Sequence, residues 1–148
     1  MDQANSPPPS HLNRYMKTKN TTQSVTFNAT PHEVYQTLMD SKKHAAFTGG
    51  KATISTKIGG TFKVYDGYIK GMNLDLVPDK KIVQAWRGSD WPKHHFSVVT
   101  FRLIRVKAGT ELIFTQIGIP DDLFKDILSG WKEYYWEPMK EAFEKNKL

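Results

Sequence analysis

The residues best suited to chemistry in this chain are its five histidines. Zinc needs three or four converging ligands, often spaced i, i+4 on a helix. Only His94 and His95 are adjacent, and the other three are widely separated: His11, His32 and His44. With no cysteine in the chain, disulfides and cysteine-ligated zinc are excluded. We therefore predict no metal site and place His94 and His95 in a surface loop.

Paired carboxylates and glycines complete the search for a reactive site. Asp121 and Asp122 are expected to open a helix, where negative charge complements the helix dipole, and Glu133 and Glu137 to form a solvated pair one turn apart. Neither glycine pair has a Walker or dinucleotide fingerprint around it: Gly49–Gly50 and Gly59–Gly60. No nucleophile elbow is present. The chain is therefore predicted not to be an enzyme and to need no cofactor.

Aromatic residues are the remaining candidates. Five could line a pocket between a sheet and the terminal helix, or could simply fill a packed core: Trp86, Phe101, Phe114, Trp131 and Tyr135. Trp91 lies in a loop and Trp136 lies off the helical stripe. Because exposed tryptophans often anchor interfaces, we interpret both, with His94 and His95, as candidate partner-binding residues. The alternative is that each tryptophan is tucked against its own surroundings.

Composition limits the class of protein. The chain has 148 residues, 39% hydrophobic and 24% charged, with a net charge of +6, which fits one globular domain. The positive charge favours an acidic partner, although a well-solvated surface explains it equally. Its basic residues are scattered rather than interleaved with stacking aromatics, so nucleic acid is not expected. No apolar run approaches the roughly 18 residues of a membrane span, and a cytoplasmic location is expected.

The N-terminal segment and the ordered domain differ in character. Residues 1–21 are polar, contain three consecutive prolines and lack periodicity, so we predict a disordered arm. A docking segment around Arg14–Lys17 is an alternative to a passive tail. Residues 22–148 are expected to form the domain.

The strongest local signal is a capping box. Thr30 can cap a helix that begins at Pro31, with Glu33 three residues after the cap. A half-buried strand from about Ser24 is expected before it, and a second short helix over Ser41–Phe47 after it.

The pattern of residues 51–118 predicts a series of strands. Turn signals at short intervals between alternating segments indicate an antiparallel meander. Met72, Leu74 and Leu76 alternate with polar residues, Asp66–Gly67 has the form of a two-residue hairpin turn, and Gly71 is a candidate bulge.

After Gly118 the apolar period changes from two to 3.6, which predicts a long amphipathic helix. Pro138 predicts a kink in it, with two shorter helices as the alternative. The predicted fold is therefore α+β of the helix-grip kind: a curved antiparallel sheet of about six to seven strands wrapped around a long C-terminal helix, with two short helices after the first strand.

Several segments, taken in order from about Ser24 to Phe143, resemble the domain found in activators of the heat-shock protein 90 ATPase. They are Thr30–Tyr35 with Leu38, Ile58–Phe62, Asp66–Gly67, Asp75–Pro78, Ile82–Val83 with Trp86–Arg87, Trp91–Pro92, Gly109–Leu112, Gly118–Pro120, and Gly130–Trp131 with Tyr134–Tyr135. The resemblance is to the second, C-terminal domain of the eukaryotic co-chaperone.

This resemblance implies a Bet v 1-like, START-like fold and a cytosolic co-chaperone that binds heat-shock protein 90. It implies stimulation of the chaperone's ATPase by favouring the closed state. The family's two-domain members carry a further N-terminal domain where this chain has a polar arm, so modest stimulation is expected. The alternative is a carrier of a small hydrophobic ligand, which an open sheet–helix cavity on the order of several hundred Å³ would favour over a packed core.

Overall fold

The structure, a computed structural model, describes residues 16–146. Seven antiparallel strands form one sheet in the order β2-β8-β7-β6-β5-β4-β3. The strands are β2 (Thr18–Phe27), β3 (Thr53–Ile54), β4 (Thr61–Val64), β5 (Ile69–Val77), β6 (Lys81–Gly88), β7 (Ser97–Val106) and β8 (Gly109–Pro120). Because the first described strand pairs with the last, the chain returns to its starting edge before the terminal helix begins.

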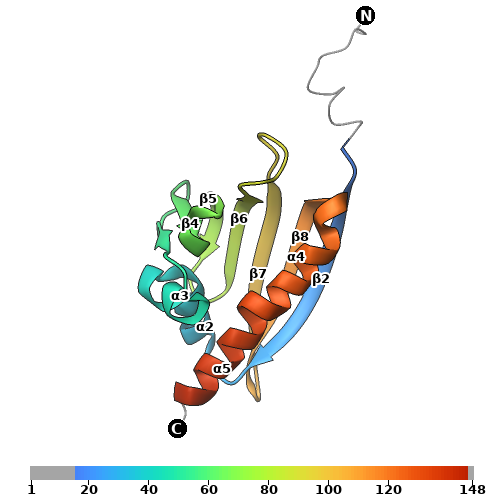
Figure 1. The fold of residues 1–148 in the computed structure, drawn as a ribbon. Helices are drawn as coiled ribbons and strands as arrows, with labels where there is room; N and C mark the ends of the chain where they lie inside the picture. The colour runs from blue at the N-terminus through green and yellow to red at the C-terminus, as the bar shows by residue number, and fades with distance from the viewer. Residues whose placement is uncertain (1–15, 147–148) are drawn as a thin grey trace, which may run out of the picture.

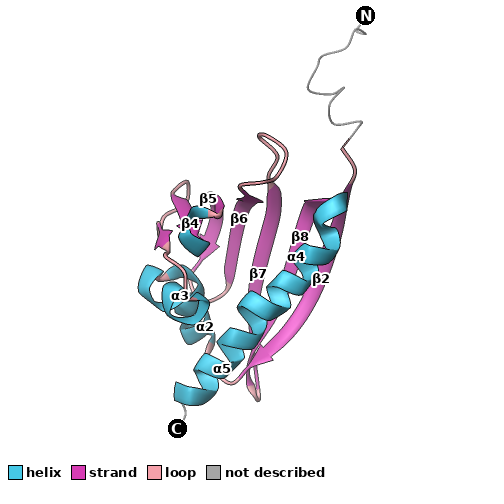
Figure 2. Cartoon of the chain, viewed as in Figure 1, coloured by secondary structure: helices cyan, strands magenta, loops and turns pink. Residues whose placement is uncertain are grey.

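Helices cover one face of this sheet, as Figure 1 shows. Two short helices follow β2, and a long irregular helix ends the domain (Figure 2). The helical elements are α2 (Pro31–Met39), α3 (Ser41–Thr48), η1 (Tyr65–Gly67), η2 (Asp121–Leu123), α4 (Phe124–Trp131), η3 (Lys132–Trp136) and α5 (Glu137–Asn146). The predicted α+β helix-grip fold is confirmed.

The capping box is present as predicted. The Thr30 side chain accepts a hydrogen bond from the Glu33 backbone N–H at 3.1 Å, and the Glu33 carboxylate accepts one from the Thr30 N–H at 2.8 Å. The second helix ends at Gly49, whose φ of +80° is a left-handed conformation that glycine adopts without strain.

Strand β2 begins earlier than the sequence suggested. Thr18 and the residues after it pair with β8, so this strand starts before residue 22, where the domain was expected to begin. Hydrophobic alternation missed this part because its side chains are largely exposed. Backbone pairing holds it instead, with the Asn20 side chain accepting from the Gly118 N–H at 3.0 Å and Lys19 paired with Asp121 at 3.2 Å. Residues 1–15 of the predicted arm lie outside the described residues.

The connection between β4 and β5 also differs from the expected two-residue turn. Val64 pairs with Ile69, so four residues separate the strands, and Tyr65 and Asp66 both have positive φ. The bulge in β5 falls between Asn73 and Asp75 rather than at Gly71. A Cβ at Gly71 would lie 1.7 Å from the Ala85 carbonyl oxygen, so the glycine is required by close packing.

The expected acidic cap of the terminal helix takes another form. Asp121 and Asp122 lie in the short 3-10 turn η2, and no side chain there makes a capping hydrogen bond.

The interruption at Pro138 is a widened turn. In η3 the Glu137 N–H bonds to the Lys132 carbonyl, a π-helical i to i−5 step. A regular helix would bond the Tyr134 carbonyl to the N–H of residue 138, which proline lacks. The Tyr65 hydroxyl supplies the missing donor, at 2.7 Å from the Tyr134 carbonyl oxygen.

This wide turn changes which residues face the sheet. Trp131 and Trp136, five residues apart, both lie buried with rings 5.5 Å apart and 21° from parallel. A strict period of 3.6 places Tyr134 on the apolar stripe with Trp131, but its side chain is 52% exposed. The assignments of Tyr134 and Trp136 were wrong because a period of 3.6 was applied across a turn that contains an extra residue.

We predict that Tyr65→Phe lowers the free energy of unfolding by about 1 kcal/mol, the typical net value of a hydrogen bond. In a Pro138→Ala background residue 138 regains an N–H, so the same change should have little effect. Urea unfolding of the four proteins gives the coupling energy.

Tyr68→Phe is the matched control, because its hydroxyl bonds to Asp90 rather than to the helix. Tyr68→Phe should lower the free energy of unfolding by the same amount with Pro138 and in the Pro138→Ala background. An equal effect of Tyr65→Phe in both backgrounds would contradict the role assigned to Pro138.

Candidate functional site

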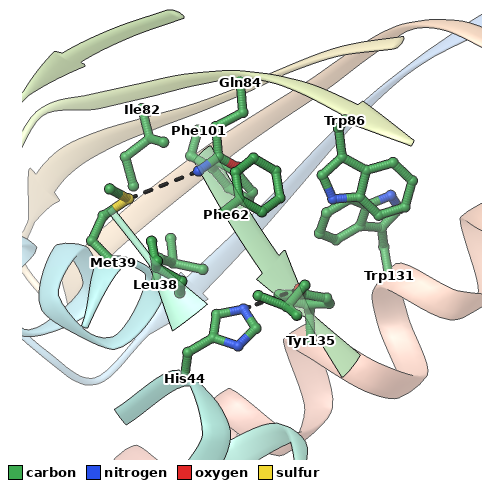
Figure 3. Close-up of a pocket in the computed structure, with 12 residues that line it drawn as sticks. Leu38, Met39, His44, Phe62, Ile82, Gln84, Trp86, Phe101, Trp131 and Tyr135 are labelled. Carbon is green, nitrogen blue, oxygen red and sulfur yellow. Dashed lines mark hydrogen bonds between the residues drawn. The ribbon is translucent and has the colours of Figure 1, made fainter. Parts of the chain in front are cut away.

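The core beneath the terminal helix is packed. A small space of about 20 Å³ lies among side chains of α2, α3, the sheet and the terminal helix, enough for one water molecule. Figure 3 shows these side chains closing on it from both sides. The residues are Leu38, Met39, His44, Ile54, Phe62, Val64, Ile82, Gln84, Trp86, Phe101, Trp131 and Tyr135.

His44 is the histidine in this wall. It is 3% exposed, and its Nε2 lies 3.1 Å from the Tyr135 hydroxyl oxygen (Figure 3). Its Nδ1 has no hydrogen-bond partner among the described residues. Burial lowers the pKa of His44 to about 4, so the imidazole is neutral at pH 7.

A buried amide pair continues the wall along the sheet. Gln84 donates to the Asn73 side-chain oxygen at 3.0 Å. Asn73, fully buried, donates to the carbonyls of Ser55 and Lys57 at 2.7 and 3.0 Å. This pair ties the segment before β4 to β5 and β6.

The alternation of Met72, Leu74 and Leu76 with polar residues would by itself favour the apolar residues, rather than Asn73, for the inner face. Met72 and Leu74 are instead 42% and 44% exposed. Apolar alternation alone could not have shown this, because Met72 and Leu74 lie on the outer face while Ile69 and Leu76 pack against the core.

Beside the terminal helix lies an open cleft of about 530 Å³. It is bounded by α4 and η3 on one side, and by η1 and the loop after β6 on the other. The lining is mainly aromatic and aliphatic, with two carboxylates: Tyr65, Tyr68, Ile69, Trp86, Asp90, Trp91, Leu123, Asp126, Ile127, Gly130, Trp131, Tyr134 and Tyr135. Its volume lies within the range of roughly 300–1,000 Å³ typical of ligand pockets.

Hydrogen bonds fix the loop wall of this cleft. The Arg87 guanidinium donates to the carbonyls of Trp91, Pro92 and His95 at 2.8, 3.3 and 3.1 Å. The Tyr68 hydroxyl donates to Asp90 at 2.6 Å. Burial, reinforced by this bond to Asp90, raises the pKa of Tyr68 to about 12, so the phenol keeps its proton at neutral pH.

The five residues predicted to line a cavity separate into three groups. Trp86, Trp131 and Tyr135 line both the small enclosed space and the open cleft, whereas Phe101 lines only the former. Phe114 lines neither, because its ring is fully buried with its centre 4.4 Å from that of Trp131.

The candidate partner-binding residues are not brought together on one exposed surface. Trp91 and Trp136 are 4% and 6% exposed, so neither is an exposed anchor. The Trp136 indole N–H donates to the Gln23 side chain at 2.7 Å. His94 is exposed, and His95 is half-buried with Nε2 2.7 Å from the Gly118 carbonyl oxygen. A role in partner binding stays a prediction for all four residues.

Within residues 16–146 no group of three or more His, Asp or Glu side chains could hold a metal ion. None of the helices in this range is long and apolar enough to cross a membrane.

The buried His44 predicts acid sensitivity. Its folded-state pKa of about 4 lies below the unfolded value of 6.5, so the unfolded chain binds the proton more tightly. The stability that the neutral His44 contributes is complete above about pH 6.5 and is lost as the pH falls towards 4. The loss in the free energy of unfolding reaches about 2 kcal/mol by pH 5. Urea unfolding of His44→Phe should show a smaller loss of stability between pH 7 and pH 5 than the unmodified chain. His94→Gln, at an exposed site, is the control, and an unchanged loss in His44→Phe would contradict the assignment.

Similarity to known proteins agrees with this architecture. Residues 28–144 match the family described as activator of Hsp90 ATPase homolog 1-like protein. The human activator of 90 kDa heat shock protein ATPase homolog 1 is 37% identical over 118 residues, covering 80% of this chain and 35% of that protein. The chain thus spans about a third of the length of this relative.

Solved structures share the fold. An HSP90 activator from Plasmodium falciparum superposes with a TM-score of 0.77 at 24% identity, covering 86% of this chain and 95% of that one. An Aha1 dimer from Colwellia psychrerythraea superposes with a TM-score of 0.74 at 19% identity, covering 85% and 96%. With the helix-grip fold and the match over residues 28–144, the chain belongs to the activator of Hsp90 ATPase homolog 1-like family.

Proposed function

We propose that this chain is a co-chaperone that binds heat-shock protein 90 and modestly stimulates its ATPase by favouring the closed state. The observation that carries the proposal is membership of the activator family, together with 37% identity to the human protein named as an activator of this ATPase. The chain would act as a binding partner and leave the chemistry to the chaperone.

A binding partner can shift a conformational equilibrium only through its difference in affinity for the two states. A tenfold stimulation by this route requires only ~1.4 kcal/mol of differential binding. Such a difference is small enough to come from a few contacts.

The outer face of the sheet supports a protein-binding role. An apolar row crosses four neighbouring strands there, and we call it the outer row: Met72 on β5, Ala85 on β6, Val98 on β7 and Ile117 on β8, each paired in register with the next. Met72, Val98 and Ile117 are 42%, 38% and 56% exposed. Contiguous exposed apolar surface of this kind is typical of interaction sites.

Charge supports an acidic partner for the same face. Side chains alternate between the two faces along β7, so the exposed Arg102 lies on the same face as Val98, four residues further along the strand. The whole chain carries +6. Electrostatic attraction between complementary charges mainly raises the association rate, and salt weakens this attraction.

The modest effect is proposed for residues 1–148 acting alone. Joining two binding domains by a linker makes the second contact intramolecular, at an effective concentration on the order of millimolar. A chain of this length, about a third of the human relative, binds at its own bulk concentration.

We predict that the chain stimulates the steady-state ATPase of purified heat-shock protein 90 less than a two-domain activator does at equal concentration. The half-saturating concentration should rise with salt. Arg102→Glu should raise it roughly threefold to tenfold.

Lys132→Glu is the matched control, since it changes the net charge equally on the exposed side of the terminal helix. Stimulation equal to that of a two-domain activator, or a half-saturating concentration independent of salt, would refute the proposal. An equal effect of both variants would exclude the outer face as the contact.

A further inference from the structure

The open cleft has a charge and a lining that the co-chaperone role leaves unexplained. Its floor is formed by buried aromatic rings, and Tyr68 and Tyr134 at its edge are 43% and 52% exposed. The charged residues of the lining are Asp90 and Asp126, and no lysine, arginine or histidine among the described residues lines it. In a chain with a net charge of +6, this is a locally acidic site.

The two carboxylates are available to a ligand. Neither forms an ion pair with a described residue. Asp90 accepts one hydrogen bond, from Tyr68 at 2.6 Å, and both residues are exposed at the edge of the cleft.

The walls are held before any ligand arrives. The Tyr65 hydroxyl joins η1 to the terminal helix through the Tyr134 carbonyl at 2.7 Å. The three bonds from Arg87 fix the opposite loop. Preformed, mostly apolar concavities with a few placed polar groups are typical small-molecule sites.

We propose that this cleft binds a small organic cation with an apolar body, such as a quaternary or tertiary ammonium compound. The aromatic faces and the two carboxylates both favour positive charge, and the floor takes the apolar body. An anion would face the two carboxylates without a compensating base. A neutral hydrophobe would use the floor but leave the carboxylates unmatched.

The volume indicates a small molecule rather than a segment of another protein, because about 530 Å³ fits a ligand of drug-like size. Binding of such a ligand does not depend on heat-shock protein 90, and the chaperone is absent from the experiment.

The test uses three probes that share a decyl tail and differ in the charge of the head group: decyltrimethylammonium, decyl sulfate and decyl maltoside. Each is used below its micelle-forming concentration. The four tryptophan indole N–H signals of the full chain are followed by NMR. Trp86, Trp91 and Trp131 line the cleft, whereas Trp136 does not and donates to Gln23. Trp136 is therefore an internal control.

Decyltrimethylammonium is expected to shift the three cleft indoles more than that of Trp136 and to bind at least fivefold more tightly than either other probe. Asp90→Asn with Asp126→Asn should weaken its binding at least fivefold. Asp126→Asn alone, at an exposed helical position, should weaken it about twofold to threefold and provides a second, milder variant.

Asp122→Asn removes the same charge from an exposed position outside the cleft, and should change the affinity less than twofold. Equal binding of decyl maltoside, undiminished binding in the double variant, or an equal loss in Asp122→Asn would overturn the proposal. So would shifts confined to Trp136.

Discussion

The wide turn of the terminal helix, at Lys132–Trp136, is the constraint on which the rest of the domain depends. It brings Trp131 and Trp136 to the same face of the helix, stacked 5.5 Å apart. Each indole N–H then reaches a glutamine of the sheet. Trp131 donates to Gln116 on β8 at 2.8 Å, and Trp136 donates to Gln23 on β2 at 2.7 Å. A regular helical turn would separate these side chains by about 140° around the axis, and one of the two anchors would be lost. The helix is therefore fixed across the seam where the first and last strands pair.

The same turn shapes the open side of the molecule. It turns Tyr134 outward to the edge of the cleft and leaves the Tyr134 carbonyl to the Tyr65 hydroxyl. The core below stays closed, with about 20 Å³ of internal space, while about 530 Å³ lies open beside the helix. The structure thus combines the packed core expected of a co-chaperone with the open concavity expected of a ligand carrier. The two spaces share Trp86, Trp131 and Tyr135 as lining residues, but the closed core lies under the helix and the cleft opens beside it.

The sequence predicted those parts of the fold that depend on local chemistry. Thr30 and Glu33 form a capping box from contacts three residues apart, and the second helix stops at Gly49 because glycine readily adopts positive φ. Prediction from the sequence failed where contacts between distant segments determine which side chains are buried. Asn73 is buried because Ser55 and Lys57 offer it carbonyl groups from another segment. Trp136 is buried because of a turn whose extra residue no fixed period describes. The cleft could not be predicted, since its walls come from η1, the loop after β6 and α4, which tertiary packing alone brings together.

The chain belongs to the activator family and has its fold, and its action on heat-shock protein 90 is proposed. The most direct measurement is the equilibrium affinity of the purified chain for purified heat-shock protein 90, without nucleotide and with a non-hydrolysable ATP analogue. Because a partner shifts an equilibrium only by its differential affinity, we predict direct binding that is tighter with the analogue, by at least the factor of any ATPase stimulation. Equal affinity in both states, or no binding in either, would contradict it.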